Sequence, residues 1–138
     1  MERTLAIIKP DAVSRGMTGD ILKRIEASGL MITAIRKTHL KREHAQEFYD
    51  VHKARPFFGS LCEYMTSSPV VIMVLSGERA IARWRELMGA TDPAKAATGT
   101  IRKDFGVDVE KNAVHGSDAA ETAAREVSFF FSAIEILS

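Results

Sequence analysis

Runs of apolar residues alternate along the chain with segments in which apolar side chains recur every three or four positions. Thr4 to Ile8 and Pro69 to Leu75 are apolar at almost every position, which predicts buried central strands. Met31 to Leu40 is rich in β-branched residues and ends in a polar tail, so we expect a second strand there. Asn112 to His115 is the expected last strand.

Segments with helical spacing separate these strands. Asp11 to Gly16 is expected to be a turn, and Ala90 to Ala113, punctuated by Gly and Pro, is expected to hold only short helical pieces around Pro93 to Ala97 and Ile101 to Phe105. An irregular segment of this length inside a small domain is usually functional. The predicted helices are one that Thr18 caps and Gly29 ends, Glu43 to Val51, one that starts at Pro56 and runs through Met65, Glu78 to Met88, and Asp118 to Phe131.

This order of elements predicts an α/β sandwich, with a four-stranded, mostly antiparallel sheet covered by helices. The ferredoxin-like βαββαβ arrangement with inserted helices and a long loop before the last strand is the favoured fold. A parallel doubly wound sheet is the alternative. No linker, repeat or low-complexity segment divides the 138 residues, so we expect one domain spanning 1–138.

Composition narrows the class of protein. The chain is 46% hydrophobic and 27% charged, with a net charge of +1, so no overall field points to nucleic acid or to an acidic membrane. Cys62 is the single cysteine, which excludes an internal disulfide and favours a reducing compartment. The apolar run Leu5 to Ile8 is too short for a signal peptide, and no run reaches transmembrane length. We therefore expect a cytoplasmic protein.

The segment around His115 carries the strongest chemical signal. The imidazole is expected at the end of a short strand, and Gly116 removes side-chain bulk beside it. Ser117 and Asp118 are good helix N-caps, and Asp118 with Glu121 is typical of a helix start. Because a helix N-terminus favours anions, we hypothesise a nucleophilic histidine that accepts a phosphoryl group. The alternative is a histidine at a strand end with no chemistry.

Other residues allow two interpretations each. Lys9, at the carboxyl end of a buried strand, is either a phosphate ligand or a solvated strand terminus. Tyr49 is either a core residue with one hydrogen-bond partner or a donor to a bound molecule. Phe57 either stacks on a flat ring or packs into the core, and Cys62 is expected to be a packing residue. The histidines show no metal-ligand spacing, so no protein-bound metal is expected.

Five segments, in order and with the expected gaps, resemble the nucleoside diphosphate kinase family, and the likeness covers essentially the whole chain. They are Thr4 to Asp11 with its lysine, Arg55 to Phe58 with Tyr49 just before it, Gly89 to Pro93, Gly99 to Arg102, and Asn112 to Asp118.

The resemblance implies a two-step, ping-pong reaction. His115 attacks the γ-phosphate of a nucleoside triphosphate and becomes phosphohistidine, and the phosphoryl group then passes to a nucleoside diphosphate. The other residues with implied catalytic roles are Glu126, which orients His115, and Ser117, Lys9 and Tyr49.

The resemblance also implies the residues that bind the nucleotide. Cations contact the phosphates, a hydroxyl and an amide contact phosphate and sugar oxygens, and an aromatic ring stacks on the base with an apolar residue facing it. Stacking reads no base edges, so tolerance of all bases is expected. The implied nucleotide-binding residues are Lys9, Phe57, Arg85, Thr91, Arg102, Val109 and Asn112.

Cofactor and partners follow from the same resemblance. Mg²⁺ is expected on the nucleotide with no direct protein ligand, and Asp118 is expected to act on it through water. The expected partners are nucleoside di- and triphosphates and further copies of the chain, in a tetramer or hexamer, with no membrane and no specific nucleic acid. Asp92 and Thr98 depart from the common Asn and Pro, and loss of the proline loosens the loop by up to about 1 kcal/mol. The chain ends at Ser138, without the extension of eukaryotic relatives, which points to a bacterial type.

Alternatives from other functional classes fit the sequence less well. A non-enzymatic RNA-binding module would need exposed aromatics on its strands and a basic face, whereas these strands carry aliphatic residues. Neither a P-loop nor the glycine-rich loop of protein kinases is present. An interaction protein that kept the fold and lost activity is disfavoured because all the expected catalytic positions are filled.

Overall fold

Four antiparallel strands form one sheet in the order β2-β3-β1-β4. They are β1 (Glu2–Ile8), β2 (Met31–Thr38), β3 (Val70–Gly77) and β4 (Val114–Gly116) in this computed structural model, which describes residues 1–138. This order, with every neighbour antiparallel, is the predicted ferredoxin-like arrangement. The parallel doubly wound alternative is wrong.

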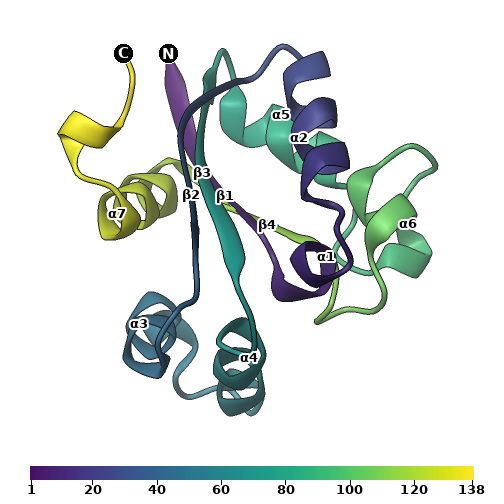
Figure 1. The fold of residues 1–138 in the computed structure, drawn as a ribbon, viewed down its shortest axis with the longest axis vertical. Helices are drawn as coiled ribbons and strands as arrows, with labels where there is room; N and C mark the ends of the chain where they lie inside the picture. The colour runs from purple at the N-terminus through teal and green to yellow at the C-terminus, as the bar shows by residue number, and fades with distance from the viewer.

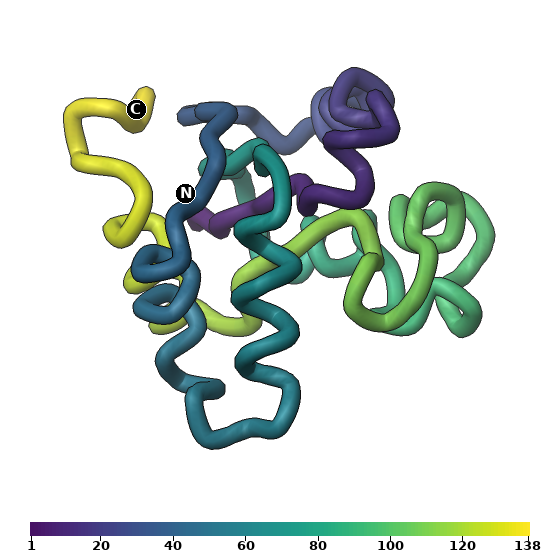
Figure 2. The backbone as a smooth tube through the Cα atoms, turned by 60° about the horizontal axis from the view of Figure 1, so that its bottom comes forward, coloured from purple at the N-terminus to yellow at the C-terminus, as the bar shows by residue number.

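Helices cover both faces of the sheet (Figure 1). The α-helices are α1 (Pro10–Ser14), α2 (Thr18–Ala27), α3 (Arg42–Phe48), α4 (Phe58–Met65), α5 (Ala80–Met88), α6 (Ile101–Phe105) and α7 (Ala120–Phe130). Short 3₁₀ turns lie at Asp50–His52, Pro93–Lys95 and Ala133–Glu135. Figure 2 shows that the α3–α4 hairpin and the segment around α6 project from the sheet as two separate protrusions.

Each face of the sheet packs its own apolar cluster. Along β1, Leu5 and Ile7 point into the cluster that contains residues of α3, α4 and α7. Ala6 and Ile8 point to the opposite face, into the cluster that contains residues of α2 and α5. This alternation follows from the period of two along a strand, and it explains why β1 is apolar at successive positions. β1 is thus a central strand that packs on both faces, and Lys9 directly follows its buried end.

The edge of the sheet at β2 is only partly covered. Met31 and Ile35 are 49% and 50% exposed on this strand. A bulge at Thr33 interrupts its register with β3, and the carbonyl of Thr33 accepts a hydrogen bond from Leu137 N at 2.9 Å. The C-terminal segment therefore lies against the start of β2, and both termini lie at the same end of the sheet (Figure 1).

The structure corrects several predicted boundaries. Asp11 to Gly16 is not a simple turn, because Pro10 begins the short helix α1 at a position where its fixed φ suits a helix. α7 begins at Ala120 rather than Asp118, and Thr122 Oγ1 accepts the hydrogen bond from Ala119 N. The short helical pieces before β4 are confirmed. None of the helices combines the length and the apolar character that crossing a bilayer requires.

Candidate active site

His115 lies on the edge strand β4, opposite Ile7 of β1. Paired residues of antiparallel strands point to the same face, so the imidazole lies on the side of the sheet that α7 covers. Its ring stands edge-on to Phe48, with 5.6 Å between ring centroids. From the other face, Trp84 Nε1 donates a hydrogen bond to the His115 carbonyl at 3.2 Å. The histidine is therefore fixed through both its backbone and its ring.

Gly116 is required by close packing on that other face. A Cβ at this position would lie 2.6 Å from Met88 Cε and 2.6 Å from Trp84 Cδ1. Any side chain would push β4 away from α5, and His115 would move with it.

A carboxylate holds one nitrogen of the His115 ring. Nε2 lies 2.8 Å from Oε1 of Glu126, which α7 supplies. Ser117 Oγ donates to the same carboxylate oxygen at 3.0 Å and accepts a hydrogen bond from Leu5 N at 3.2 Å. An ionised carboxylate only accepts hydrogen bonds, so Nε2 carries the proton and the lone pair is on Nδ1. Nδ1 makes no hydrogen bond within the chain.

Tyr49 lies beside this pair, with its ring centroid 6.5 Å from that of His115. Its hydroxyl is buried and has no hydrogen-bond partner, so the predicted single partner within the core is absent. Burial, reinforced by the negative charge of Glu126, raises the pKa of this hydroxyl. Tyr49 is therefore a neutral donor without an acceptor, and such groups call for an explanation.

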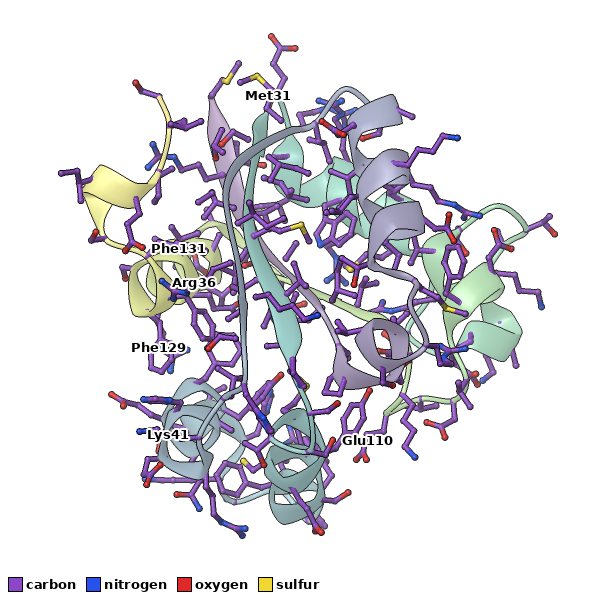
Figure 3. The ribbon with its side chains drawn as sticks, in the orientation of Figure 1. Met31, Arg36, Lys41, Glu110, Phe129 and Phe131 are labelled. Atoms are coloured by element: carbon purple, nitrogen blue, oxygen red, sulfur yellow. The ribbon has the colours of Figure 1, made fainter.

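Lys9 is a buried cation with no carboxylate partner. Its Nζ donates to Asn112 Oδ1 at 2.9 Å and to the Glu110 carbonyl at 3.4 Å. Burial and the nearby Arg102 guanidinium lower the pKa of Lys9 from 10.5 to about 8. Figure 3 shows Glu110 beside α4, and Ser60 Oγ of that helix donates to the Glu110 carboxylate at 2.9 Å.

Asn112 ties Lys9 to the long irregular segment. Its amide nitrogen donates to the carbonyls of Thr91 and Val109, each at 3.0 Å. The side chain thus uses its acceptor for the lysine and its donors for two loop carbonyls. The Thr91 side chain is exposed.

Arg102 is the second buried cation. Its Nη1 and Nη2 donate to the carbonyls of Gly89 and Val114 at 3.1 and 2.9 Å, and its Nε is buried with no partner. Burial and the neighbouring Arg85 lower the pKa of Arg102 to about 10. Arg85 pairs with Asp118 at 2.7 Å on the exposed surface of α5.

Electrostatic coupling links these three cations in a chain from Lys9 through Arg102 to Arg85. Arg102 lowers the pKa of Lys9, and Arg85 lowers that of Arg102. Arg102 thus lies near two other cations, and Lys9 and Arg102 are both buried, so an anion with several charges would stabilise this arrangement.

The proposed base-stacking pair is open to solvent. Phe57 is 45% exposed at the start of α4, and Val109 is 58% exposed in the loop before β4. Phe57 is therefore not packed into the core, and its ring contacts only His52 among aromatic side chains, at 5.6 Å. Cys62, by contrast, is buried, and burial raises its thiol pKa, which fits the expected packing role.

Cavity volume does not locate this site. A cavity of about 590 Å³ lies instead between the chain termini, the start of β2 and α7. A second, of about 550 Å³, reaches only its rim at Arg85 and Asp118. Hydrogen bonds instead join Glu126 of α7 to the His115 ring and Arg102 of α6 to the Val114 carbonyl of β4.

Comparison with known proteins decides the family. The sequence profile described as nucleoside diphosphate kinase matches residues 2–136. The chain belongs to the nucleoside diphosphate kinase family. The kinase from Geotalea uraniireducens is 58% identical over 137 residues, which are 99% of this chain and 100% of that one. The kinase from an Anaeromyxobacter species is 61% identical over 136 residues, 99% of this chain and 92% of that one.

Solved structures of the family share the fold. The nucleoside diphosphate kinase of Aquifex aeolicus superposes with a TM-score of 0.96 at 49% identity, and the match covers 99% of each chain. That of Halobacterium salinarum, solved in complex with CDP, gives 0.95 at 42% identity and covers 99% of this chain and 91% of that chain.

The predicted activity is thereby confirmed. As a nucleoside diphosphate kinase, the enzyme transfers the γ-phosphate of a nucleoside triphosphate to a nucleoside diphosphate. Enzymes of this family use a divalent metal for catalysis. No group of three or more His, Cys, Asp or Glu side chains in the structure is arranged to hold a metal ion.

Sequence reasoning missed several residues that shape this kinase site. Asp11, assigned to a turn, accepts hydrogen bonds from Tyr64 and from the backbone of Ala113. Trp84, whose Nε1 donates to the His115 carbonyl, is another such residue. The sequence Pro-Asp after a strand is itself a helix-start signal and could have identified Asp11. The expected capping role of Asp118 is wrong, because its carboxylate pairs with Arg85.

Proposed function

We propose that His115 is the residue that carries the phosphoryl group. In the first half-reaction, Nδ1 forms a bond to the γ-phosphorus, the bond from phosphorus to the β–γ bridging oxygen breaks, and the nucleoside diphosphate leaves. In the second, a β-phosphate oxygen of another diphosphate attacks the same phosphorus, and the N–P bond breaks. The observation that carries the proposal is the 2.8 Å contact of Nε2 with Glu126, which leaves the Nδ1 lone pair free.

Glu126 and Ser117 serve that histidine. The carboxylate fixes the tautomer and stabilises the positive charge that develops on the ring as Nδ1 bonds to phosphorus. Ser117, which donates to the same oxygen, keeps the Glu126 carboxylate oriented. The unpaired hydroxyl of Tyr49 supplies a donor next to the ring.

Lys9, Arg85 and Arg102 neutralise the polyphosphate. Phosphoryl transfer requires alignment and charge stabilisation, and forked guanidinium contacts provide both. The buried, unpartnered Nε of Arg102 and the carboxylate-free Lys9 support this role. Asn112 and the hydroxyl of Thr91 complete the set around the phosphates and the sugar.

Phe57 and Val109 receive the base, one stacking on a ring face and the other lying opposite. Their exposure supports this assignment, since a ring 45% exposed retains contact area for a ligand. The bound CDP of the halophilic relative supports nucleoside diphosphates as substrates. Face stacking reads no hydrogen-bonding edge, so purines and pyrimidines are both accepted.

Mg²⁺ reaches this site on the nucleotide. The lack of an acidic or histidine cage fits a metal that retains phosphate and water ligands, which is what Mg²⁺ prefers. Asp118 would hold the ion through water, and its side chain is highly exposed beside Arg85. When bound, the ion neutralises part of the charge on the phosphates.

The chain acts as one catalytic domain over residues 1–138 in a cytoplasmic homo-oligomer, a tetramer or a hexamer. The partly uncovered β2 edge, with Met31 and Ile35 exposed, supports contact with further copies.

Incubation with γ-labelled ATP and Mg²⁺ tests the assignment. We expect an acid-labile, alkali-stable label on the protein that an added nucleoside diphosphate removes. His115→Ala should take up no label, whereas His44→Ala, on the exposed side of α3, should label like the parent chain. Labelling of His115→Ala at the parental rate would show that another residue is the nucleophile.

A further inference from the structure

The backbone just before His115 adopts a conformation that L-residues rarely take. Ala113 has φ +75°, and Val114 N donates to the Asn112 carbonyl at 2.9 Å across it. A hydrogen bond from residue i+2 to residue i around a positive φ defines the strained form of the γ-turn. Such a turn persists only where the surroundings fix it, and functional sites are where it is found.

One short segment holds both sides of that turn. The Ala113 carbonyl accepts a hydrogen bond from Lys9 N at 2.8 Å, and Ala113 N donates to the Asp11 carboxylate oxygen Oδ2 at 3.2 Å. The first contact is backbone to backbone. The second depends on one side chain, so a substitution can remove it alone.

Asp11 is itself held in place. The Tyr64 hydroxyl donates to its Oδ1, and Arg15 Nη2 lies 3.3 Å from its Oδ2. Asp11 N also donates to the Tyr64 hydroxyl oxygen at 3.0 Å. The carboxylate is 6% exposed, and burial together with its hydrogen bond raises the pKa of Tyr64. Tyr64 therefore remains a protonated donor that orients Asp11.

We propose that Asp11, oriented by Tyr64, is a positioning residue for phosphoryl transfer, because its carboxylate holds the strained turn at Ala113. The turn joins the two halves of the site. Asn112, which precedes Ala113, accepts a hydrogen bond from Lys9. His115, two residues after Ala113, contacts Glu126. The inference rests on the proposed role of His115, but Asp11 touches no reacting atom.

The test is the rate of labelling of the protein by γ-labelled ATP at saturating nucleotide, measured in a rapid-quench experiment. Asp11→Ala should slow this step by roughly 10- to 100-fold, since a misplacement of about 1 Å costs that much. Adding Ala113→Gly to Asp11→Ala should raise the labelling rate at least about threefold over that of Asp11→Ala alone, because glycine adopts a positive φ without strain. In the parent chain Ala113→Gly should change the rate by less than about threefold.

The rescue separates this role from ordinary packing. If Asp11 merely stabilised α1, a glycine at position 113 would restore nothing. Asp20→Asn, the same loss of charge on the exposed first turn of α2, should label at the parental rate. Should Asp11→Ala fail to fold, Tyr64→Phe with and without Ala113→Gly provides the same comparison.

The outcomes also separate this inference from the proposed function. A parent chain that takes up no label on His115 contradicts the proposed function. A parent chain that labels normally, with Asp11→Ala or Tyr64→Phe labelling at the same rate, overturns only the role of Asp11. Slow labelling that Ala113→Gly leaves unchanged overturns it as well.

Discussion

Oε1 of Glu126 lies 2.8 Å from Nε2 of His115, and the same oxygen accepts a hydrogen bond from Ser117. The histidine comes from the edge strand β4 and the glutamate from α7, so folding is required to join them. This contact assigns the proton to Nε2 and leaves the lone pair on Nδ1, the atom that we propose as the nucleophile. The Glu126 carboxylate is already positioned to stabilise positive charge that develops on the His115 ring.

Glu126→Gln tests the electrostatic part of that relationship. Glutamine can still accept a hydrogen bond from Nε2, but it cannot stabilise the developing positive charge. We expect the rate of His115 phosphorylation at saturating ATP to fall roughly 10- to 100-fold, within the range for orienting groups of this kind. Rapid-quench labelling measures it. Glu121→Gln, exposed in the first turn of the same helix, is the matched control, and an equal effect of both changes would contradict the role of Glu126.

The lowered pKa of Lys9 predicts that the protein takes up a proton when it binds ADP. Its pKa is lowered to about 8 in the free protein, and a phosphate beside it favours the charged form, so the pKa rises in the complex. Binding must then take up a proton above about pH 8, and the affinity must fall there by up to about tenfold per pH unit. Titration calorimetry at pH 9 in two buffers of different ionisation enthalpy gives the proton count. Equal proton uptake by Lys9→Met would exclude Lys9 as its source.

The same pKa shift predicts a stability change of known sign. The pKa of Lys9 is lowered from 10.5 to about 8 on folding, so between these values the unfolded chain binds more protons than the folded one. The free energy of unfolding should therefore rise with pH across this window, by up to about 3 kcal/mol. Urea denaturation at pH 8 and pH 10 measures it, with Lys9→Met as the reference. A rise of the same size in Lys9→Met would assign the effect to other groups.

The strands of the sheet could be predicted from the sequence because buried central strands appear as continuous apolar runs. β3 is apolar at successive positions, as a strand covered on both faces must be. The ends of elements were less predictable, because tertiary contacts decide them. Asp118 has a capping side chain, yet its carboxylate pairs with Arg85, and α7 begins two residues later.

The site divides in the same way. His115 and Lys9 could be proposed from their places at strand ends, whereas the partner of His115 came only through resemblance to a family. Nothing in the spacing of Glu126 shows that α7 returns across the sheet to the histidine. Ala113 gave no signal at all, since alanine is a residue that does not favour a positive φ. Its carbonyl and its amide form hydrogen bonds with Lys9 and Asp11, which lie far away in sequence.

Phe57→Ala should weaken the binding of all nucleotides by a similar factor. Stacking of a base on an aromatic ring contributes about 1–3 kcal/mol, so Kd should rise by roughly 5- to 150-fold. Competition binding with ADP, GDP and CDP tests both the size and the uniformity of the effect. Val107→Ala, exposed in the nearby loop and without an assigned role, should leave Kd unchanged. A loss confined to one base would mean that Phe57 takes part in reading base edges.

Gly116→Ala should destabilise the fold and slow the reaction together. The new methyl group would lie 2.6 Å from both Met88 and Trp84, so β4 and α5 must separate, at a cost of about 1–3 kcal/mol. The shift also moves His115, whose carbonyl Trp84 holds at 3.2 Å. Urea denaturation and phosphorylation rates measure the two effects. Gly19→Ala, in the first turn of α2 with no atom within 4 Å of the added Cβ, should unfold at the parental urea concentration or slightly above it. If Gly116→Ala also unfolds there, β4 is not held against α5 as closely as these contacts require.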